Sequence, residues 1–237
     1  MFSITNLSKQ SLENIQYNVG ECCNMTSKNS IKKLILITWK NTPFLNYFAP
    51  SNNVVTPITF KVWFLQKILG FNRKVYWPVH FTSRVGNYKN ILIGKGSAPG
   101  LSPGCYIQGI GIVRIGKYVY IAPNVGIISA NHNLYDTRNH DVESVEIGDY
   151  CWIGMNVVIL PGVKLGPHTL GPHTVVGAGS VVTKSFEEGY CVIAGNPARK
   201  IKDLEKDKCV DYDYPEERVG YIRADRFEKY RRKHLNV

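Results

Sequence analysis

The sequence has no hydrophobic run long enough to cross a bilayer. Apolar stretches such as Leu34–Trp39 and Val62–Leu69 are far shorter than the roughly 20 residues that a spanning helix needs. The first ten residues, MFSITNLSKQ, lack the basic and then apolar order of a secretory signal peptide. Low-complexity composition typical of disorder is also absent. We therefore expect a folded, cytoplasmic protein with no transmembrane segment.

Cysteine is sparse and scattered. None of the six cysteines forms a CxxC pair, the spacing typical of many zinc and redox sites. Cys22 and Cys23 are neighbours in the sequence, and such neighbours bond to each other only with strain. We expect reduced thiols.

Acidic residues are few: 18 Asp and Glu stand against 29 Lys and Arg, for a net charge of +11. An excess of this size favours an anionic partner, such as the phosphates of a cofactor, an acidic glycan, nucleic acid or a lipid surface. Composition does not choose among them. The 237 residues, 44% of them hydrophobic, suffice for one core with appendages.

A six-residue repeat is present, and it is the strongest signal in the chain. Aliphatic residues lead successive hexads at Ile147, Ile153, Ile159 and Leu165; earlier leaders are Ile115, Ile121 and Ile127 and, more loosely, Ile93, Pro99 and Cys105; Val176 and Val182 resume the count. A short strand plus a two-residue corner makes one flat side of a prism. The repeat therefore predicts an all-β parallel β-helix, with one irregular coil between Cys105 and Ile115, where the count slips. A β-sandwich alternates with period two instead.

The limits of the repeat predict three regions. Residues 1–75 form an irregular or helical capping segment, with an amphipathic helix near 57–71 that covers the open end of the β-helix. Peripheral membrane association of that helix is the alternative. Residues 76–202 form the β-helix, and residues 203–237 form a helical tail, which we interpret as solvated.

Two interruptions break the repeat. The polar stretch Asn131–Ser144 must leave the prism as an extruded loop, and loops on a rigid scaffold commonly carry binding and catalysis. The second is a tandem copy of LGPHT at Leu165–Thr169 and Leu170–Thr174. Five extra residues do not fit a period of six, so we expect them to bulge at a corner, with the register restored at Val176.

Five motifs occur in order: Ser129–His132, Ile147–Gly154, Ile159–Val163, Gly177–Lys184 and Ala194–Arg199. With them, the stretch from Tyr76 to Lys202 resembles the hexapeptide-repeat acyltransferases with a left-handed β-helix, in the branch of galactoside, xenobiotic and surface-polysaccharide O-acetyltransferases. Trp77–Arg84 and Ser102–Ile107 resemble its capsule and cell-surface glycan members. The resemblance implies acetyl-CoA as donor, a carbohydrate acceptor and a homotrimer with sites between subunits, without nucleic acid or metal.

Acetyl transfer to a hydroxyl needs a base, and an imidazole with a pKa near 6.5 suits that task near neutral pH. His132 lies at the mouth of the extruded loop and matches the general base of the family, with direct attack in a ternary complex. Asn131 belongs to the same motif, and Asp136 or Asp141 could orient the ring. A surface histidine without a role is the alternative. Cys151, four places after a leader, is expected in the core rather than as a nucleophile.

The resemblance also places coenzyme A. By the resemblance, the pantetheine arm contacts the positions of Trp152, Gly154, Met155, Gly177 and Ala178. The phosphates lie near Thr183, Lys184 and Arg199. Small residues let the arm approach the backbone, and cations suit phosphate oxygens. In the structural alternative, Trp152 packs on the next coil and Gly177 and Ala178 serve only the corner. The LGPHT duplication just before this groove departs from the family pattern.

The sequence thus predicts an acetyl-CoA-dependent O-acetyltransferase for a sugar hydroxyl of a bacterial surface polysaccharide or its precursor. An N-acetyltransferase for an amino sugar is the nearest alternative. Carbonic anhydrases of the γ class share the fold, and His132, His168 and His173 could hold zinc. Against this alternative, the spacing from His132 to His168 includes the long polar loop and is not that of two regular coils. The duplication of LGPHT also explains the pair His168 and His173. A scaffold that binds an anionic glycan is the last alternative.

Overall fold

The computed structural model describes residues 58–162, 164–165, 172–214 and 218–237. The chain divides into two compact units, 1–50 and 51–237. The first unit lies outside the described residues, and with it most of the predicted amino-terminal segment. The second unit contains the repeat and is described by itself.

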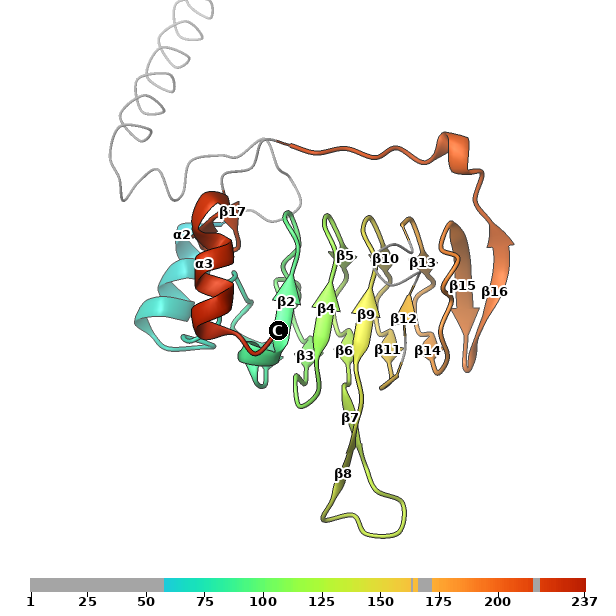
Figure 1. The fold of residues 1–237 in the computed structure, drawn as a ribbon, viewed down its shortest axis with the longest axis horizontal. Helices are drawn as coiled ribbons and strands as arrows, with labels where there is room; N and C mark the ends of the chain where they lie inside the picture. Colours follow the sequence, from blue (N-terminus) through green and yellow to red (C-terminus); the bar gives the residue numbers. More distant parts are fainter. Residues whose placement is uncertain (1–57, 163, 166–171, 215–217) are drawn as a thin grey trace, which may run out of the picture. The chain divides into compact units, whose positions relative to one another are not determined.

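The repeat forms a parallel β-helix of three sheets (Figure 1). The β1 sheet contains β1 (Arg84–Val85), β3 (Tyr106–Ile107), β6 (Gly126–Ile127), β11 (Val158–Ile159) and β14 (Val181–Val182). The β2 sheet contains β2 (Ile91–Ile93), β4 (Val113–Ile115), β9 (Val145–Ile147) and β12 (Lys164–Leu165). The β5 sheet contains β5 (Tyr120–Ile121), β10 (Trp152–Ile153), β13 (Val175–Val176), β15 (Cys191–Gly195) and the antiparallel β16 (Ala198–Asp203). Because a regular coil gives one strand to each sheet, the chain stacks the three sides of a prism.

The leaders of the hexads fill the interior of this prism. Ile147 is 3% exposed, and Ile153 and Ile159 are fully buried. Cys151 and Val157, four places after the first two leaders, are fully buried as well. Complete burial of an aliphatic side chain is worth about 1.5–3 kcal/mol relative to exposure, so every added coil adds its own core. The predicted β-helix is confirmed.

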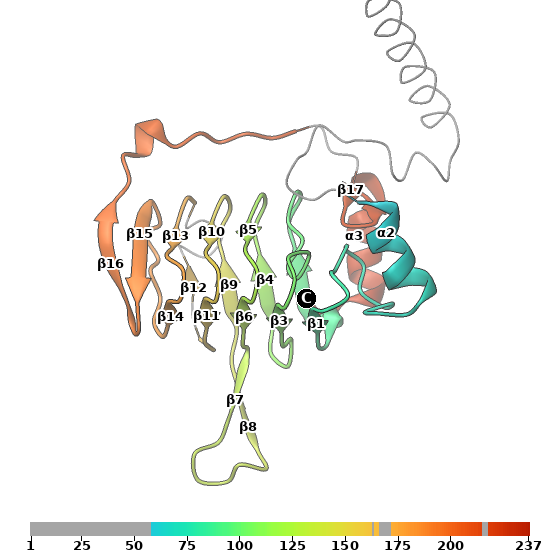
Figure 2. The same ribbon diagram turned by 180° about the vertical axis from the view of Figure 1, so that it is seen from behind.

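Strand register accounts for the extruded loop. Glu146 pairs with Lys164 three hexads later, which is one regular coil of three sides. Val113 pairs with Val145 across a longer stretch of chain. The excess over a regular coil equals the length of the predicted polar loop Asn131–Ser144. Figures 1 and 2 both show the hairpin of β7 and β8 standing away from the prism at this point.

The register also accounts for the tandem copy of LGPHT. Trp152 pairs with Val175, and the coil between them exceeds three hexads by the length of one copy of this motif. The excess therefore enters at the corner between β12 and β13, and the register is restored at Val176 as predicted. Residues 166–171, the centre of the duplication, lie outside the described residues.

One leader was predicted two positions too early. Between Ile107 and Ile115 the count does slip, since these buried leaders of β3 and β4 lie further apart than one hexad. Cys105, however, does not lead a strand: it fills the second buried position just before β3, and Ile107 is the leader. The shift lies before this position, at Gly100, whose φ is +84° and which follows a turn closed by the Leu101 amide and the Ala98 carbonyl. Gly104, with φ of +73°, takes the same corner position as Asn124 in the next coil, whose φ is +60°.

The amino-terminal end of the prism is covered by the predicted helix. It consists of α2 (Phe60–Trp63) and the π-helical turn η2 (Phe64–Ile68), and the hydroxyl of Thr59 caps its first turn by accepting from the Val62 amide. Gln66 is fully buried and donates to the Trp77 carbonyl at 2.9 Å, while its own oxygen accepts from the Val79 amide at 3.0 Å. These bonds fasten the helix to the segment that enters the first coil.

The carboxy-terminal helix reaches the same end of the prism. A short hairpin of β17 (Arg218–Val219) and β18 (Ile222–Arg223) precedes α3 (Ala224–His234). The rings of Phe227 and Tyr230 lie 5.7 and 5.5 Å from that of Tyr76. Within the tail, residues 224–234 form this helix, and its Phe227 and Tyr230 pack against the core, whereas a solvated tail was expected. Within the described ranges, no helix combines the length and apolar character needed to cross a membrane.

The chain reaches α3 through an extended segment, residues 204–214, which we call the strap (Figure 1); it includes the single turn η4 (Lys206–Lys208). The strap follows the corners between the β2 and β5 sheets, back from the last coil. There the Tyr190 carbonyl accepts from the Leu204 amide, His173 pairs with Asp211 at 2.8 Å, the Tyr150 hydroxyl donates to the Tyr212 carbonyl at 2.6 Å, and the Tyr118 hydroxyl donates to Asp213 at 2.8 Å. This second layer on the corners was not predicted from the sequence.

Candidate active site

The hairpin that leaves the prism carries His132. Its strands are β7 (Ala130–His132) and β8 (His140–Val142), which pair antiparallel. It follows β6 of the β1 sheet and returns to β9 of the β2 sheet, so it occupies one corner of the prism (Figure 2). His132 is exposed at the end of β7, where a substrate can reach it.

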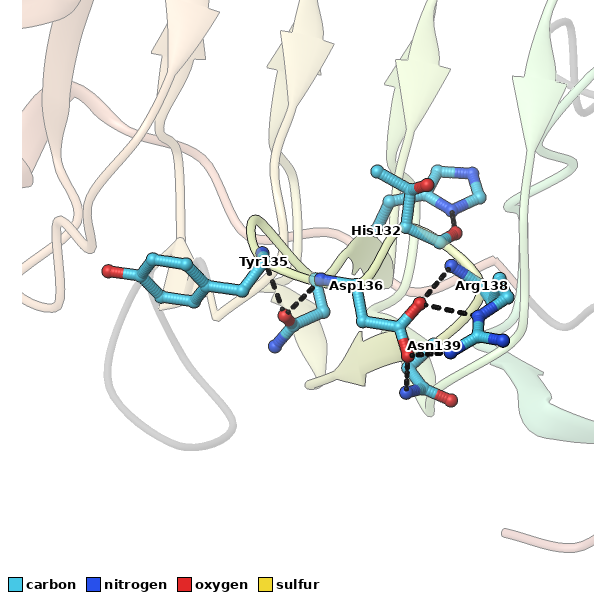
Figure 3. A network of polar contacts seen from close by, with 7 residues as sticks. His132, Tyr135, Asp136, Arg138 and Asn139 are labelled. Atoms are coloured by element: carbon cyan, nitrogen blue, oxygen red, sulfur yellow. Dashed lines mark hydrogen bonds and ion pairs between the residues drawn. The ribbon is translucent and has the colours of Figure 1, made fainter.

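One hydrogen bond defines the chemistry of the His132 ring. Nδ1 lies 2.7 Å from the backbone carbonyl oxygen of Thr137 (Figure 3). A carbonyl oxygen only accepts, so Nδ1 must carry a proton and donate. In the neutral ring the other nitrogen, Nε2, then holds the lone pair, and it makes no hydrogen bond to any described residue. A histidine in this tautomer is ready to take a proton at Nε2.

Asp136 does not contact the His132 ring, although it was one of two candidates for the orienting group. Its carboxylate receives two bonds from the Arg138 guanidinium, at 2.9 and 3.0 Å, and one from the Asn139 amide at 2.9 Å (Figure 3). The Arg138 bond lowers the pKa of Asp136 below its ordinary value. Because Thr137 lies between Asp136 and Arg138, this clamp fixes the turn that presents the Thr137 carbonyl.

Asp141 and Asn131 take other positions in the hairpin. Asp141 accepts from the Asn133 side chain at 3.1 and 3.3 Å, and Asn133 in turn accepts from the amides of Tyr135 and Asp136. Asn131 precedes His132 in β7, and adjacent strand residues point to opposite faces. The structure therefore puts Asn131 and the His132 ring on different faces of the hairpin.

His140 lies directly across the hairpin from His132. The two residues are register partners, and their ring centroids are 4.4 Å apart with 38° between the planes. Neither this contact nor the bond to Thr137 was predicted. A short hairpin of equal arms would pair these two histidines, but the sequence does not reveal where the turn begins.

The residues expected along coenzyme A gather around another corner, the one between the β5 and β1 sheets. Trp152 on β10 is 57% exposed and lies in register with the exposed Tyr120 of β5. Met155, 47% exposed, and the exposed Ala178 follow at the corners of successive coils, where the Met155 carbonyl accepts from the Gly179 amide at 2.7 Å. Together these side chains leave an apolar band on the surface.

The two glycines of this group have a structural reason of their own. A Cβ on Gly154 would lie 2.7 Å from the Ala178 nitrogen and 2.8 Å from the Val176 carbonyl oxygen. A Cβ on Gly177 would lie 2.9 Å from that of Ala194. Close approach of consecutive coils therefore requires glycine at Gly154 whether or not a ligand binds.

The candidates for phosphate binding are exposed. Thr183 and Lys184 follow β14, and the Lys184 ammonium lies 5.5 Å from the centre of the Phe186 ring. Arg199 lies on β16, where its guanidinium donates to the Ala198 carbonyl at 3.2 Å. The charges of Lys184 and Arg199 thus face solvent at the carboxy-terminal end of the prism.

The surroundings of Cys151 and His173 do not suit a catalytic role. Burial raises the pKa of the Cys151 thiol to about 12, so it stays protonated in the core, as expected. The His173 ring stacks on Tyr150 with centroids 5.0 Å apart and binds Asp211, on the corner under the strap rather than on the corner of the hairpin. His168 lies outside the described residues, and the described part of the chain holds no cluster of three or more His, Cys, Asp or Glu suited to a metal.

Known proteins share the repeat. Residues 144–184 match the family "Bacterial transferase hexapeptide (six repeats)". Galactoside O-acetyltransferase of Escherichia coli is 41% identical over 101 residues, which are 40% of this chain and 47% of that protein. The chain spans about half the length of the curated relatives that it matches.

Two solved acetyltransferases are similar to the chain as well. A maltose O-acetyltransferase of Clostridium difficile is 33% identical, with 52% of this chain and 64% of that chain covered and a TM-score of 0.44. A galactoside acetyltransferase in complex with coenzyme A is 30% identical, with 59% and 70% covered and a TM-score of 0.47. With the hexad repeat, the three-sheet prism and these identities together, the chain belongs to the hexapeptide-repeat acyltransferases, the family with a left-handed β-helix.

Proposed function

We propose that this protein is an acetyl-CoA-dependent O-acetyltransferase whose acceptor is a sugar hydroxyl, and that His132 is its general base. The observation that carries the proposal is the bond from His132 Nδ1 to the Thr137 carbonyl at 2.7 Å, which leaves the Nε2 lone pair exposed. The matched relatives, named as galactoside and maltose O-acetyltransferases, support an acetyl donor and a sugar acceptor. A surface polysaccharide or its precursor is the acceptor that we favour.

The proposed reaction uses this geometry of His132. The acceptor hydroxyl attacks the carbonyl carbon of the thioester, and its proton passes to Nε2 of His132. The tetrahedral intermediate collapses as the carbon–sulfur bond breaks, and the departing thiolate takes the proton back. Positioned general bases of this kind contribute about a hundred- to ten-thousandfold in rate. No covalent acyl-enzyme forms in this scheme.

The apolar band is the surface that we propose for coenzyme A. Trp152 and Met155 offer exposed apolar surface for the pantetheine arm, beside Ala178, whose small side chain lets the arm lie close to the backbone. Lys184 and Arg199 offer cations for phosphate oxygens. The matched galactoside acetyltransferase was solved with coenzyme A bound, which supports the same donor here.

A second copy of the chain would complete the site. The hairpin with His132 and the corner with Met155 lie at opposite edges of the β1 sheet. One subunit thus presents the base and the cofactor surface on different corners, whereas two neighbouring subunits can bring a hairpin and a corner together. We propose a homotrimer with active sites between subunits.

The test measures free thiol released from acetyl-CoA with a panel of sugars, nucleotide sugars and oligosaccharides. The wild-type protein should turn over a hydroxyl acceptor, and His132→Ala should lower kcat about a hundred- to ten-thousandfold while acetyl-CoA binding by calorimetry is kept. His80→Ala, which changes a histidine bonded to Thr82 outside the hairpin, is the matched control. Full activity in His132→Ala would refute the base, and turnover of amino sugars alone would make the enzyme an N-acetyltransferase.

A further inference from the structure

His140 lies in the same hairpin as His132 but has no role in the proposed reaction. It faces His132 as its cross-strand partner. The Asn133 amide donates to the Asn139 carbonyl at 3.0 Å in the next rung. Rungs of an antiparallel ladder alternate between hydrogen-bonded and non-hydrogen-bonded pairs, so the two histidines form the non-bonded kind, in which side chains lie closest.

The contact between the rings is close enough to restrict both. The centroids are 4.4 Å apart, and the planes are inclined by 38°, which is van der Waals contact between two flat groups. The bond from Nδ1 to the Thr137 carbonyl fixes one point of the His132 ring. This hydrogen bond is lost when the ring rotates about its Cβ–Cγ bond, and the His140 ring, packed against it, hinders that rotation.

The three charged side chains near the tip of the hairpin, Asp136, Arg138 and Asp141, are already engaged. Arg138 is bound by Asp136, and Asp141 by Asn133. In the described part of the chain, the ring of His140 contacts that of His132 and takes part in no ion pair. His140 therefore acts on the base through packing rather than through charge.

We propose that His140 is a positioning residue, which holds the ring of His132 so that Nε2 stays aimed at the acceptor hydroxyl. The inference rests on the proposed function, in which His132 is the base. Exposed side chains otherwise sample several rotamers, and a misplacement of about 1 Å costs up to about a hundredfold in rate. The aromatic ring of His140 is what matters, and its nitrogens are not required.

Two substitutions at His140 distinguish the effect of the aromatic ring from the effect of its nitrogen atoms. His140→Ala removes the ring and should lower kcat about ten- to a hundredfold, with KM for acetyl-CoA unchanged, since the cofactor surface lies on another corner. His140→Phe keeps a flat ring and should restore kcat to within about threefold of the wild type. Val142→Ala, on the same strand and 54% exposed, is the matched control and should leave kcat unchanged.

Nitrogen NMR of His132 gives a readout that needs no turnover. The protonated Nδ1 should persist as one sharp signal in the wild type and in His140→Phe, and average between tautomers in His140→Ala. Wild-type kcat in His140→Ala would overturn the proposal, and so would equal losses in the Phe and Ala variants, which would assign the role to a ring nitrogen. Activity retained in His132→Ala would instead refute the base, while the NMR comparison would still test the packing.

Discussion

The ring of Tyr150 lies parallel to that of His173, with centroids 5.0 Å apart and 8° between the planes. Both residues occupy the same corner in successive coils, and both have positive φ, 58° and 65°. Tyr118 and Tyr190 repeat this conformation in the coils before and after. Non-glycine residues rarely adopt it. The four rings thus form a column, and these four residues hold the strap.

Docking of the strap should depend on pH through Asp213. The bond from Lys95, and after it the one from Tyr118, lowers the pKa of Asp213 below its ordinary 3.8. A carboxyl whose pKa is lowered on folding stabilises the fold above its unfolded pKa, and this contribution is lost as pH falls through the folded value. We expect Asp213→Asn to lower the melting temperature near about pH 6 and to match the wild type near about pH 2. Thermal melts over this range test it, and an equal gap at both ends would contradict it.

Lys67 should give a pH dependence in alkali. Burial, and then the charge of Arg73, lowers the pKa of its ammonium from 10.5 to about 8, and Nζ donates to the Val75 carbonyl at 2.7 Å. Between these values the unfolded chain binds more protons than the folded one, so the unfolding free energy should rise with pH. Lys67→Met should remove this rise. Urea titrations at several pH values from about 8 to about 10.5 compare the two proteins, and parallel curves would show that Lys67 is not responsible.

The hairpin offers a test of which carboxylate supports the base. Asp136→Ala releases the turn that holds the Thr137 carbonyl, and we expect kcat to fall about ten- to a hundredfold with little change in KM for acetyl-CoA. Asp141→Ala loses only the bond to the Asn133 amide and should cost less. Steady-state kinetics of both variants decide the matter. A larger loss in Asp141→Ala would assign the orienting role to the other carboxylate.

Gly154 should resist substitution for reasons of packing. Gly154→Ala places a methyl group within 2.7 Å of the backbone of Ala178, and forced overpacking typically costs about 1–3 kcal/mol. Gly126→Ala is the matched control, because its Cβ would lie 3.8 Å from the Val158 side chain, an ordinary contact. Chemical denaturation should show a loss in the first variant alone. Equal stability of the two would contradict the tight stacking of coils at this corner.

Most of the fold could be predicted from the hexads because their information is local. The period located the buried leaders Ile147, Ile153 and Ile159, and each coil stacks on its neighbour in the sequence, so strand partners follow from counting. The same counting located the extruded loop and the added corner after β12. The error at Cys105 arose where a glycine turn shifted the register and no regular coil lay on the amino-terminal side to fix the count.

The candidate site was predicted only in part. The Asn-His motif and the polar loop singled out His132, and the roles proposed for it and for the cofactor residues stay predictions. The group bonded to its ring is a backbone carbonyl, which has no signature in the sequence. Asp136 was a reasonable choice by chemistry, yet its oxygens turn to Arg138 because a guanidinium two positions away closes a bidentate pair within the turn.

By itself the sequence determined the prism, because a six-residue period repeats the same packing requirement in every coil and needs no distant contact to express it. Only the tertiary structure showed which parts of the prism the carboxy-terminal tail contacts. The strap meets the corner rings of Tyr118 and Tyr150, and α3 meets Tyr76, although these partners lie far apart along the chain. It also decided that His140 meets His132. Such contacts between residues distant in the sequence depend on the path of the chain in space, which no local pattern of residues predicts.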